Sequence, residues 1–413
     1  MSFAIRADIM GELETTFSLS KTQLGEIAST AFWGFTLAMI FGGPLCDVFG
    51  MGRLLALAFI GHVAGIGLTI FATGYGMLFS GTLCIGLANG FVEAACNPLI
   101  ATIFADEKTK KLNQFHVWFP GGIVIGGLVA FALTQAELGF QAKMATMLLP
   151  ALIYGAMFLG KGFPKTERAA SGVTMGQMFS ECLRPLFLIM VACMFLTAST
   201  ELGPNQWLPN ILTFSAGVSG ILVLVYINGL MAVGRQFAGP VVHKLSPSGM
   251  LFGSAVVSAA GLLALSRAQG GFQAFGAATI FAIGICYFWP TMLGFVSERL
   301  PKTGALGLAI MGGAGMLSVS WILPIMGGIY DSQNAAALGL PEELEGDALA
   351  GALDTFRTAA EGSPEAAQWI EAQAIGGAET LGTVFWLPVA LIAVFGLLYL
   401  SDRRKGGYKA EQI

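Results

Sequence analysis

Residues 86–98 read Gly-Leu-Ala-Asn-Gly-Phe-Val-Glu-Ala-Ala-Cys-Asn-Pro and lie within a long apolar segment. Asn89, Glu93 and Asn97 follow one another at intervals of four residues, so a helix places them on one face while its other faces stay apolar. A charged side chain at mid-membrane depth costs about 2.5–3.5 kcal/mol on insertion scales and is tolerated where it faces a bundle interior or a watery cavity. Glu93 is therefore the leading functional candidate, against the alternative of a structural carboxyl hydrogen-bonded between helices.

The composition indicates an all-α polytopic membrane protein. Hydrophobic residues make up 55% of the chain, charged residues only 11%, and the mean hydropathy is +0.73. A soluble globular domain carries about 25% charged residues. We expect the lipid bilayer as the surroundings and no nucleic acid as a partner.

Eleven apolar runs are long enough to span a bilayer. A shorter run, Ser2–Met10, precedes them and is followed by a polar segment, Gly11–Leu24, which we expect to be a loop. An odd number of spans after a stub suggests a truncated first helix; the alternative is a true half-helix or surface segment. The predicted spans are 26–46, 54–73, 77–104, 115–134, 144–160, 185–203, 216–239, 249–266, 273–296, 305–329 and 381–400.

The distribution of basic residues predicts the orientation. If the stub exits on the outer face, sixteen Lys and Arg residues fall on the inner side and four on the outer side. This bias places the C-terminus in the cytoplasm and indicates a multi-pass protein of the cytoplasmic (inner) membrane.

The loops divide the chain into two halves. We expect an N-terminal half at 1–160, a cytoplasmic linker at 161–184, a C-terminal half at 185–405 and a cytoplasmic tail at 406–413. A long outer loop at 330–380 carries ten of the twenty-five acidic residues, with helical stretches expected around Leu344–Ala360 and Pro364–Ala374. We interpret it as a solvated insertion; the alternative is a cap over the outer mouth.

Paired motifs indicate an internal duplication, as in many secondary transporters. Gly43-Pro44 before Asp47 is matched by Gly239-Pro240 before His243. Glu107-Lys108 after the span 77–104 is similarly matched by Glu298-Arg299 after the span 273–296.

The motif at 43–53, Gly-Pro-Leu-Cys-Asp-Val-Phe-Gly-Met-Gly-Arg, resembles the cytoplasmic loop signature of the major facilitator superfamily. The resemblance implies the major facilitator fold, two six-helix halves related by a pseudo-two-fold axis, with helix 1 truncated here. It also implies gating roles for Asp47 and Arg53. The second copy has His243 in place of the acid, and Arg235 is expected at the same gate.

Within that superfamily, Glu93-Ala94-Ala95-Cys96-Asn97-Pro98 followed by Leu112-Asn113 is similar to the fucose permease group of sugar:proton symporters. The resemblance implies that Glu93 binds sugar and a proton. It also suggests an acidic partner on helix 1, for which Asp8 is the nearest residue. Glu201 to Pro209 is similar to the outer end of helix 7 in sugar transporters.

Polar and aromatic residues expected near the midplane form the candidate binding set. Carboxylates and carboxamides bind hydroxyl groups, and an aromatic face covers the apolar face of a sugar. Each aromatic residue taken singly can also serve packing or interfacial anchoring. The set comprises Glu93, Asn89, Asn97, Asp8, Arg6, Glu201, Gln206, Trp207, Asn228, Tyr287, Trp289 and Trp321.

The leading hypothesis is a monomeric secondary active transporter that moves a small polar solute, most consistent with a sugar, by alternating access. Because a carboxyl whose exposure changes can bind and release a proton, we expect proton coupling through Glu93. The alternative is an organic anion carrier or efflux pump using Arg6 and Arg235.

The third class of hypothesis is a membrane enzyme or a receptor. The sequence has no H-E-x-x-H, G-x-S-x-G or G-x-x-x-x-G-K-[ST] motif, and its three histidines, His62, His116 and His243, are scattered. We therefore expect no enzymatic activity, no catalytic residue, no metal site and no cofactor.

Overall fold

The computed structural model describes residues 1–17, 21–158, 160–165, 174–218, 220–360 and 362–411. Over these ranges the chain forms helices and the turns between them, with no strand. The expectation of an all-α protein is confirmed.

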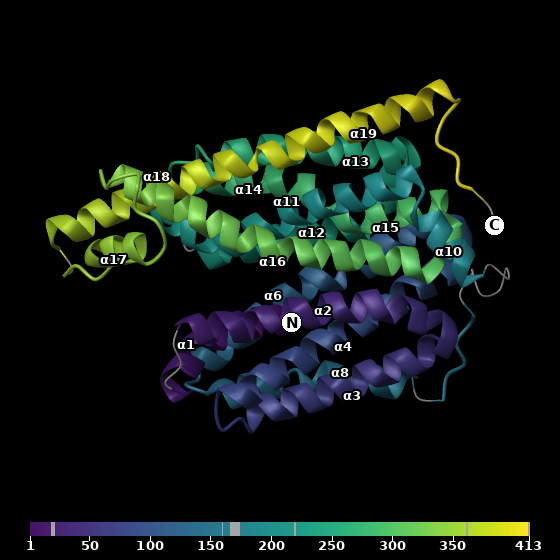
Figure 1. Cartoon of the computed structure of the whole chain (residues 1–413), viewed down its shortest axis with the longest axis horizontal. Coiled ribbons are helices and arrows are strands. Elements are labelled where there is room, and N and C mark those ends of the chain that lie inside the picture. Colours follow the sequence, from purple (N-terminus) through teal and green to yellow (C-terminus); the bar gives the residue numbers. More distant parts are fainter. Residues whose placement is uncertain (18–20, 159, 166–173, 219, 361, 412–413) are drawn as a thin grey trace.

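The helices form two bundles that lie side by side (Figure 1). The first bundle contains α1 (Ser2–Phe17), α2 (Lys21–Phe49), α3 (Met51–Ile70), α4 (Tyr75–Ile103), η1 (Ala105–Glu107), α5 (Lys108–Phe115), α6 (Trp118–Gln135), α7 (Phe140–Ala145) and α8 (Leu148–Phe158). The second contains α11 (Pro185–Ser215), α12 (Gly220–Gln236), α13 (Ala238–Leu265), α14 (Gly271–Ile285), α15 (Phe288–Arg299), η2 (Pro301–Thr303), α16 (Gly304–Ala337), α17 (Gly346–Arg357), α18 (Pro364–Val384) and α19 (Trp386–Arg404). A short helix, α10 (Met175–Cys182), lies between them in the sequence.

Nine helical stretches within the described ranges are long and apolar enough to cross a membrane. Each coincides with a predicted span. The other two predicted spans, 144–160 and 216–239, contain the shorter helices α8 and α12. The chain is therefore a multi-pass membrane protein.

Two predicted loops are largely helical. α1 continues to Phe17 and α2 begins at Lys21, so the expected loop Gly11–Leu24 is wrong on both sides of residues 18–20, which lie outside the described residues. In the acidic segment 330–380, α16 runs on to Ala337, and the two expected helical stretches are confirmed as α17 and α18.

The backbone supports the internal repeat. Gly50 after α2 has a φ of 86°, and Ser246 has a φ of 61°. The number of residues between these two equals the number between Gly43 and Gly239. Phe104 after α4 (φ −115°, ψ 57°) and Leu300 after α15 (φ −135°, ψ 51°) are separated by that interval too. The proposed match of Glu107 with Glu298 is wrong, because Glu298 precedes this turn in its half and Glu107 follows it.

Glycines allow the helices of each bundle to pack closely, as is common in membranes. A Cβ on Gly65 of α3 would lie 2.7 Å from the Gly81 carbonyl oxygen of α4. A Cβ on Gly261 of α13 would lie 2.8 Å from Phe281 Cβ of α14. Gly65 and Gly261 are also related by the repeat interval, so both bundles use the same close contact.

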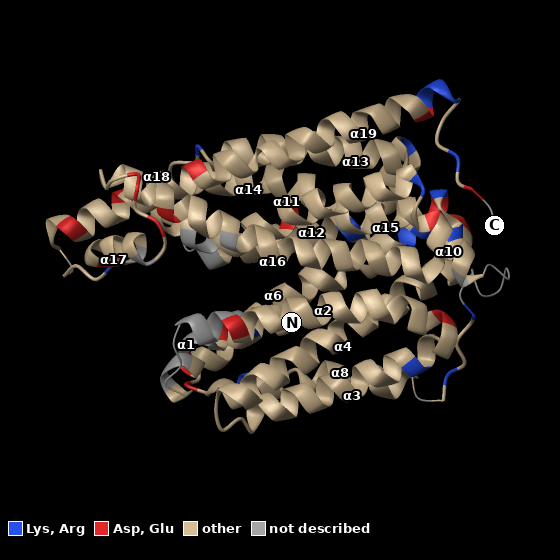
Figure 2. Cartoon of the chain, in the orientation of Figure 1, with Lys and Arg blue, Asp and Glu red and all other residues tan. Residues whose placement is uncertain are grey.

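Charged residues gather at the two ends of the bundles and are rare between them (Figure 2). We call the end that carries Lys110, Lys111, Arg184, Arg299 and Arg403 the basic end. The opposite end, where α17 and the start of α18 extend beyond the first bundle, is the acidic end (Figures 1 and 2).

The two bundles contact each other through α2 with α16, α6 with α12, and α5 with α15. At the basic end these contacts are polar: Thr109 donates to Oε1 of Glu298 from its backbone nitrogen (3.1 Å) and from Oγ1 (2.6 Å). Asn113 Nδ2 donates to Thr291 Oγ1 at 3.3 Å. The basic end is therefore closed by direct contacts between α5 and α15.

Candidate functional site

A cavity of about 300 Å³ lies between the two bundles, within the size range of small-molecule sites. Its two walls differ in chemistry. The first bundle contributes the aromatic rings, and the second contributes most of the polar groups. The aromatic wall contains Phe3, Phe32, Phe119 and Phe131, and the polar wall contains Glu201, Asn205, Gln206 and Asn228.

A second cavity, of about 10 Å³, holds space for about one water molecule. It is lined by Glu93, His116, Phe119, Glu201, Leu202, Arg235, Trp289 and Met316. Phe119, Glu201, Leu202 and Met316 line both cavities, so the two are neighbours. We call the small one the charged cavity, because it brings together two carboxylates and a guanidinium.

Arg235 and Glu201 form a buried ion pair beside the charged cavity. Nη2 of Arg235 lies 2.8 Å from Oε1 of Glu201, and the two side chains are 1% and 2% exposed. Arg235 also donates from Nε to the Cys286 carbonyl oxygen at 2.7 Å. Its Nη1 donates to the His116 carbonyl oxygen at 3.2 Å, which links the two bundles.

Arg235 lies in the last turn of α12, and its side chain is only 1% exposed. The segment Gly239 to Lys244, expected to close the span, is helical at the start of α13, and the chain turns only at Ser246. This places Arg235 well inside the bundle. The charge of Arg235 is therefore compensated internally by Glu201.

Glu93 of α4 contacts His116 at the break between α5 and α6. Its Oε1 lies 3.5 Å from Nδ1 of His116, while Oε2 has no hydrogen-bond partner among the described residues. The other ring nitrogen of His116, Nε2, lies 3.0 Å from Oδ1 of Asn97. Glu93 and Asn97, predicted to share one helix face, thus meet the same histidine.

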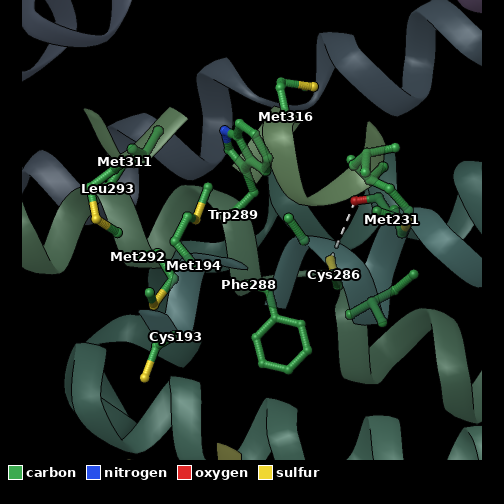
Figure 3. Packing of buried hydrophobic residues seen from close by; sticks show 14 of the residues in the cluster. Cys193, Met194, Met231, Cys286, Phe288, Trp289, Met292, Leu293, Met311 and Met316 are labelled. Carbon is green, nitrogen blue, oxygen red and sulfur yellow. Dashed lines mark hydrogen bonds between the residues drawn. The ribbon is translucent and has the colours of Figure 1, made fainter. Parts of the chain in front are cut away.

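Trp289 of α15 lines the charged cavity together with Glu93. Figure 3 shows the Trp289 ring pointing away from Phe288 and toward Met316. Gly315 permits this position, since a Cβ there would lie 2.5 Å from the nearest atom of the Trp289 ring.

Asn89 belongs to a separate polar network. Its Oδ1 lies 3.0 Å from Nε2 of His62, whose Nδ1 lies 2.8 Å from the Tyr154 hydroxyl. Asn89 Nδ2 donates to Ser2 Oγ at 3.4 Å. Asn89 lines neither cavity, and it connects α4 with α1, α3 and α8.

Two candidates on α1 lie at the large cavity or beside it. Asp8 lines the cavity and pairs with Lys143 at 2.7 Å. The Arg6 guanidinium lies 5.0 Å from the ring centroid of Phe3 and 5.3 Å from that of Phe32, both of which line the cavity. None of the ion pairs within the described ranges includes Arg6.

Three aromatic candidates lie outside both cavities. Trp207 packs against Tyr330 with ring centroids 6.0 Å apart, and the Tyr287 hydroxyl donates to the Gly234 carbonyl oxygen at 3.0 Å. Trp321 is 54% exposed and contacts Phe195. The polar candidates Gln206 and Asn228 do line the large cavity.

The gating candidates Asp47 and Arg53 flank the turn at Gly50. Arg53 Nη1 donates to the Phe49 carbonyl oxygen at 3.4 Å. Thr109, Asn113 and Glu298 also make contacts that close the basic end. Thr109 and Asn113 belong to the polar segment 107–114 between two apolar spans. The sequence of this segment does not show which residues it contacts.

Sequence reasoning missed three contributors to the cavities. The sequence marks His116 only as one of three scattered histidines, Asn205 is not among the predicted candidates, and nothing distinguishes the cavity phenylalanines among the thirty-one in the chain. Only their contacts across the two bundles distinguish them.

The chain matches the family model described as Major Facilitator Superfamily over residues 4–331. Among solved structures it is similar to the Escherichia coli fucose:proton symporter, with 15% identity, a TM-score of 0.64, and coverage of 94% of this chain and 95% of that one. It is also similar to the proton:xylose symporter, with 16% identity, a TM-score of 0.66 and coverage of 94% and 92%.

Among proteins of known function, the chain is 22% identical to the cis,cis-muconate transport protein of Acinetobacter baylyi, over 57% of this chain and 61% of that protein. It is 23% identical to the 3-(3-hydroxy-phenyl)propionate transporter of Escherichia coli, over 75% and 78%. The family match covers most of the chain and agrees with the two-bundle fold: the protein belongs to the major facilitator superfamily of transporters.

Proposed function

We propose that this transporter moves a neutral polyhydroxylated solute, a sugar or polyol, together with a proton. The observation that carries the proposal is the two-sided cavity, with phenylalanine rings on one wall and Glu201, Asn205, Gln206 and Asn228 on the other. Carboxamides and a carboxylate bind hydroxyl groups, while aromatic rings cover the apolar face of a sugar. Arg235 adds no free positive charge, because Glu201 compensates it.

The orientation follows from the distribution of charge. The basic end, with the C-terminal tail, faces the cytoplasm, and the acidic end faces outward. Because the basic end is closed by the contacts of Thr109 and Asn113, the large cavity is expected to accept solute from the outer side. Alternating access then requires these contacts to break. A monomer in the inner membrane is sufficient, since both walls belong to one chain.

A second candidate substrate is an organic anion, and Arg6 favours it. Its guanidinium lies against two rings of the cavity wall without an acidic partner among the described residues. A carboxylate solute entering the cavity would supply that partner. The relatives named for muconate and hydroxyphenylpropionate agree with this candidate.

The test is thermal stability of the purified protein with fucose, xylose, myo-inositol, muconate and 3-(3-hydroxyphenyl)propionate. Under the proposal, the midpoint rises with a sugar or polyol, and Asn228→Ala abolishes the rise. Trp321→Ala is the matched control, because Trp321 lies outside the cavity. Stabilisation by the two acids alone, lost in Arg6→Gln, would replace the sugar with an organic anion.

Proton coupling is tested separately in proteoliposomes that enclose a pH-sensitive dye. The solute that stabilises the protein, added outside, is expected to acidify the lumen as it enters. Uptake of that solute with no change of luminal pH would exclude proton symport.

A further inference from the structure

We propose that Glu93 and His116 together form one proton-binding site, in which Asn97 fixes the hydrogen on Nε2 of His116 so that the pair holds a single shared proton. The inference rests on the proposed proton coupling and names the residues that hold the proton. It assigns His116 a role that the sequence did not suggest, and it gives Asn97, one of the predicted candidates, a specific one.

The first step is the tautomer of His116. Its Nε2 lies 3.0 Å from Oδ1 of Asn97. An amide oxygen only accepts hydrogen bonds, so Nε2 must carry a hydrogen. In the neutral ring, Nδ1 is then the unprotonated nitrogen and acts as an acceptor.

The second step is the contact on the other side of the ring. Nδ1 of His116 lies 3.5 Å from Oε1 of Glu93. An ionised carboxylate is also only an acceptor, so these two atoms attract each other only when a proton lies between them. That proton resides on Glu93, which then donates to Nδ1, or on Nδ1, which then donates to Glu93. Either way, the pair holds one proton more than a carboxylate facing a neutral ring.

The surroundings keep this proton away from bulk water. His116 is 4% exposed and the Glu93 side chain 14%. The titratable and charged groups that face the pair are Arg235 of α12, Glu201 of α11 and Cys96 of α4. Because Arg235 is held by Glu201, it does not replace the proton as the partner of Glu93.

The third step links the proton to the contact between the bundles. The backbone oxygen of His116 accepts from Nη1 of Arg235, while the His116 ring contacts Glu93 and Asn97 of the first bundle. Loss of the proton leaves two acceptors facing each other, so Glu93 and the ring are expected to separate. Movement of His116 would then disturb its bond to Arg235, and with it a contact that joins the two halves.

Local backbone features leave room for such a movement. His116 lies between α5 and α6, outside regular helix. Pro98 lies inside α4, one residue after Asn97, and lacks the N–H that would bond the preceding turn. Both sides of the pair are therefore at helix irregularities.

The experiment is nitrogen NMR of protein labelled with ¹⁵N-histidine, in lipid nanodiscs, across pH 5 to 9. The chain has only three histidines. His62→Gln, His116→Gln and His243→Gln assign the signals, and His243→Gln also serves as the control outside the charged cavity. The readout does not require a transported solute, so it remains informative if the proposed substrate is wrong.

We expect Nε2 of His116 to stay protonated throughout and Nδ1 to pass through one transition as the shared proton leaves. In Glu93→Gln, whose amide donates to Nδ1 but binds no proton, that transition should disappear. In Asn97→Leu, the hydrogen should move to Nδ1 at high pH, because Glu93 then becomes the better partner.

Two results would overturn the proposal. One is a His116 transition that is the same in Glu93→Gln as in the unchanged protein, which would mean that the histidine binds its proton alone. The other is no transition at Nδ1 in the unchanged protein over this pH range.

Discussion

Glu93 of α4 and Trp289 of α15 occupy equivalent positions in the two repeats, and they meet in the same small cavity. Their separation equals that of Gly50 from Ser246. The duplication has thus placed a carboxyl and an indole at equivalent positions on the two sides of the pseudo-two-fold axis. The two halves share a backbone plan but differ in the chemistry they bring to the charged cavity.

The buried pair of Arg235 and Glu201 gives the first prediction. Glu201→Leu leaves the guanidinium buried without its carboxylate, and we expect a loss of about 3–5 kcal/mol in stability. The double variant Glu201→Leu, Arg235→Leu removes both charges and should recover much of this loss. Thermal unfolding of the purified variants measures the effect. The pairing would be contradicted if the double variant lost as much stability as Glu201→Leu and Arg235→Leu lose when their separate effects are added.

The closed basic end gives the second prediction. A Cβ on Gly294 of α15 would lie 2.8 Å from the Cα of Thr109 on α5. Because this Cα belongs to the backbone of α5, a change of side-chain rotamer cannot relieve the clash. Gly294→Ala should therefore push α5 and α15 apart and favour the state open at the basic end. Distances between spin labels on these two helices should increase. Gly253→Ala on α13 is the control, since a Cβ there meets nothing within 4 Å.

The turn at Gly50 gives the third prediction. Its φ of 86° and ψ of 154° lie in a region that residues other than glycine rarely adopt. Gly50→Ala should lower stability by about 1–3 kcal/mol through backbone strain. No atom lies within 4 Å of the added Cβ, so a steric clash cannot account for such a loss. Gly67→Ala, in the regular part of α3 with equally open surroundings, should instead be neutral or slightly stabilising.

The C-terminal tail gives the fourth prediction. Tyr408 packs on Arg299, whose guanidinium lies 4.5 Å from its ring centroid, and Arg299 in turn pairs with Asp402. Burial raises the pKa of Tyr408 well above its usual value of 10.0. The packed tail therefore favours the neutral phenol. Its contribution to stability is complete below pH 10 and is lost as the pH rises from there through the folded-state pKa.

Ultraviolet titrations of the phenolates in the unchanged protein and in Tyr408→Phe should therefore differ by one tyrosine, and that tyrosine should ionise well above pH 10.0. If the tyrosine that distinguishes the two titrations ionises near its usual pKa of 10.0, the tail does not pack on Arg299. Tyr408→Phe keeps the ring contact, so the tail should remain in place while the pH dependence is lost.

The sequence by itself determined the membrane spans and the family, and it predicted Glu93 as the leading candidate. Apolar runs of about 20 residues fix where helices cross a bilayer, because an unpaired backbone is too costly in lipid. The motif at 43–53 and its second copy indicated the duplication, and the four-residue spacing of Asn89, Glu93 and Asn97 placed them on one helix. These are local properties, readable along the chain.

Only the tertiary structure decided which side chains share a site. Asn89 turned toward His62 while Asn97 turned toward His116, although both belong to the same helix stripe. Arg235 joined Glu201 in the interior because α13 continues the helix beyond Gly239-Pro240 before the chain turns at Ser246. Each of these contacts joins residues from different helices, and the packing of those helices, rather than any spacing in the sequence, sets which groups meet.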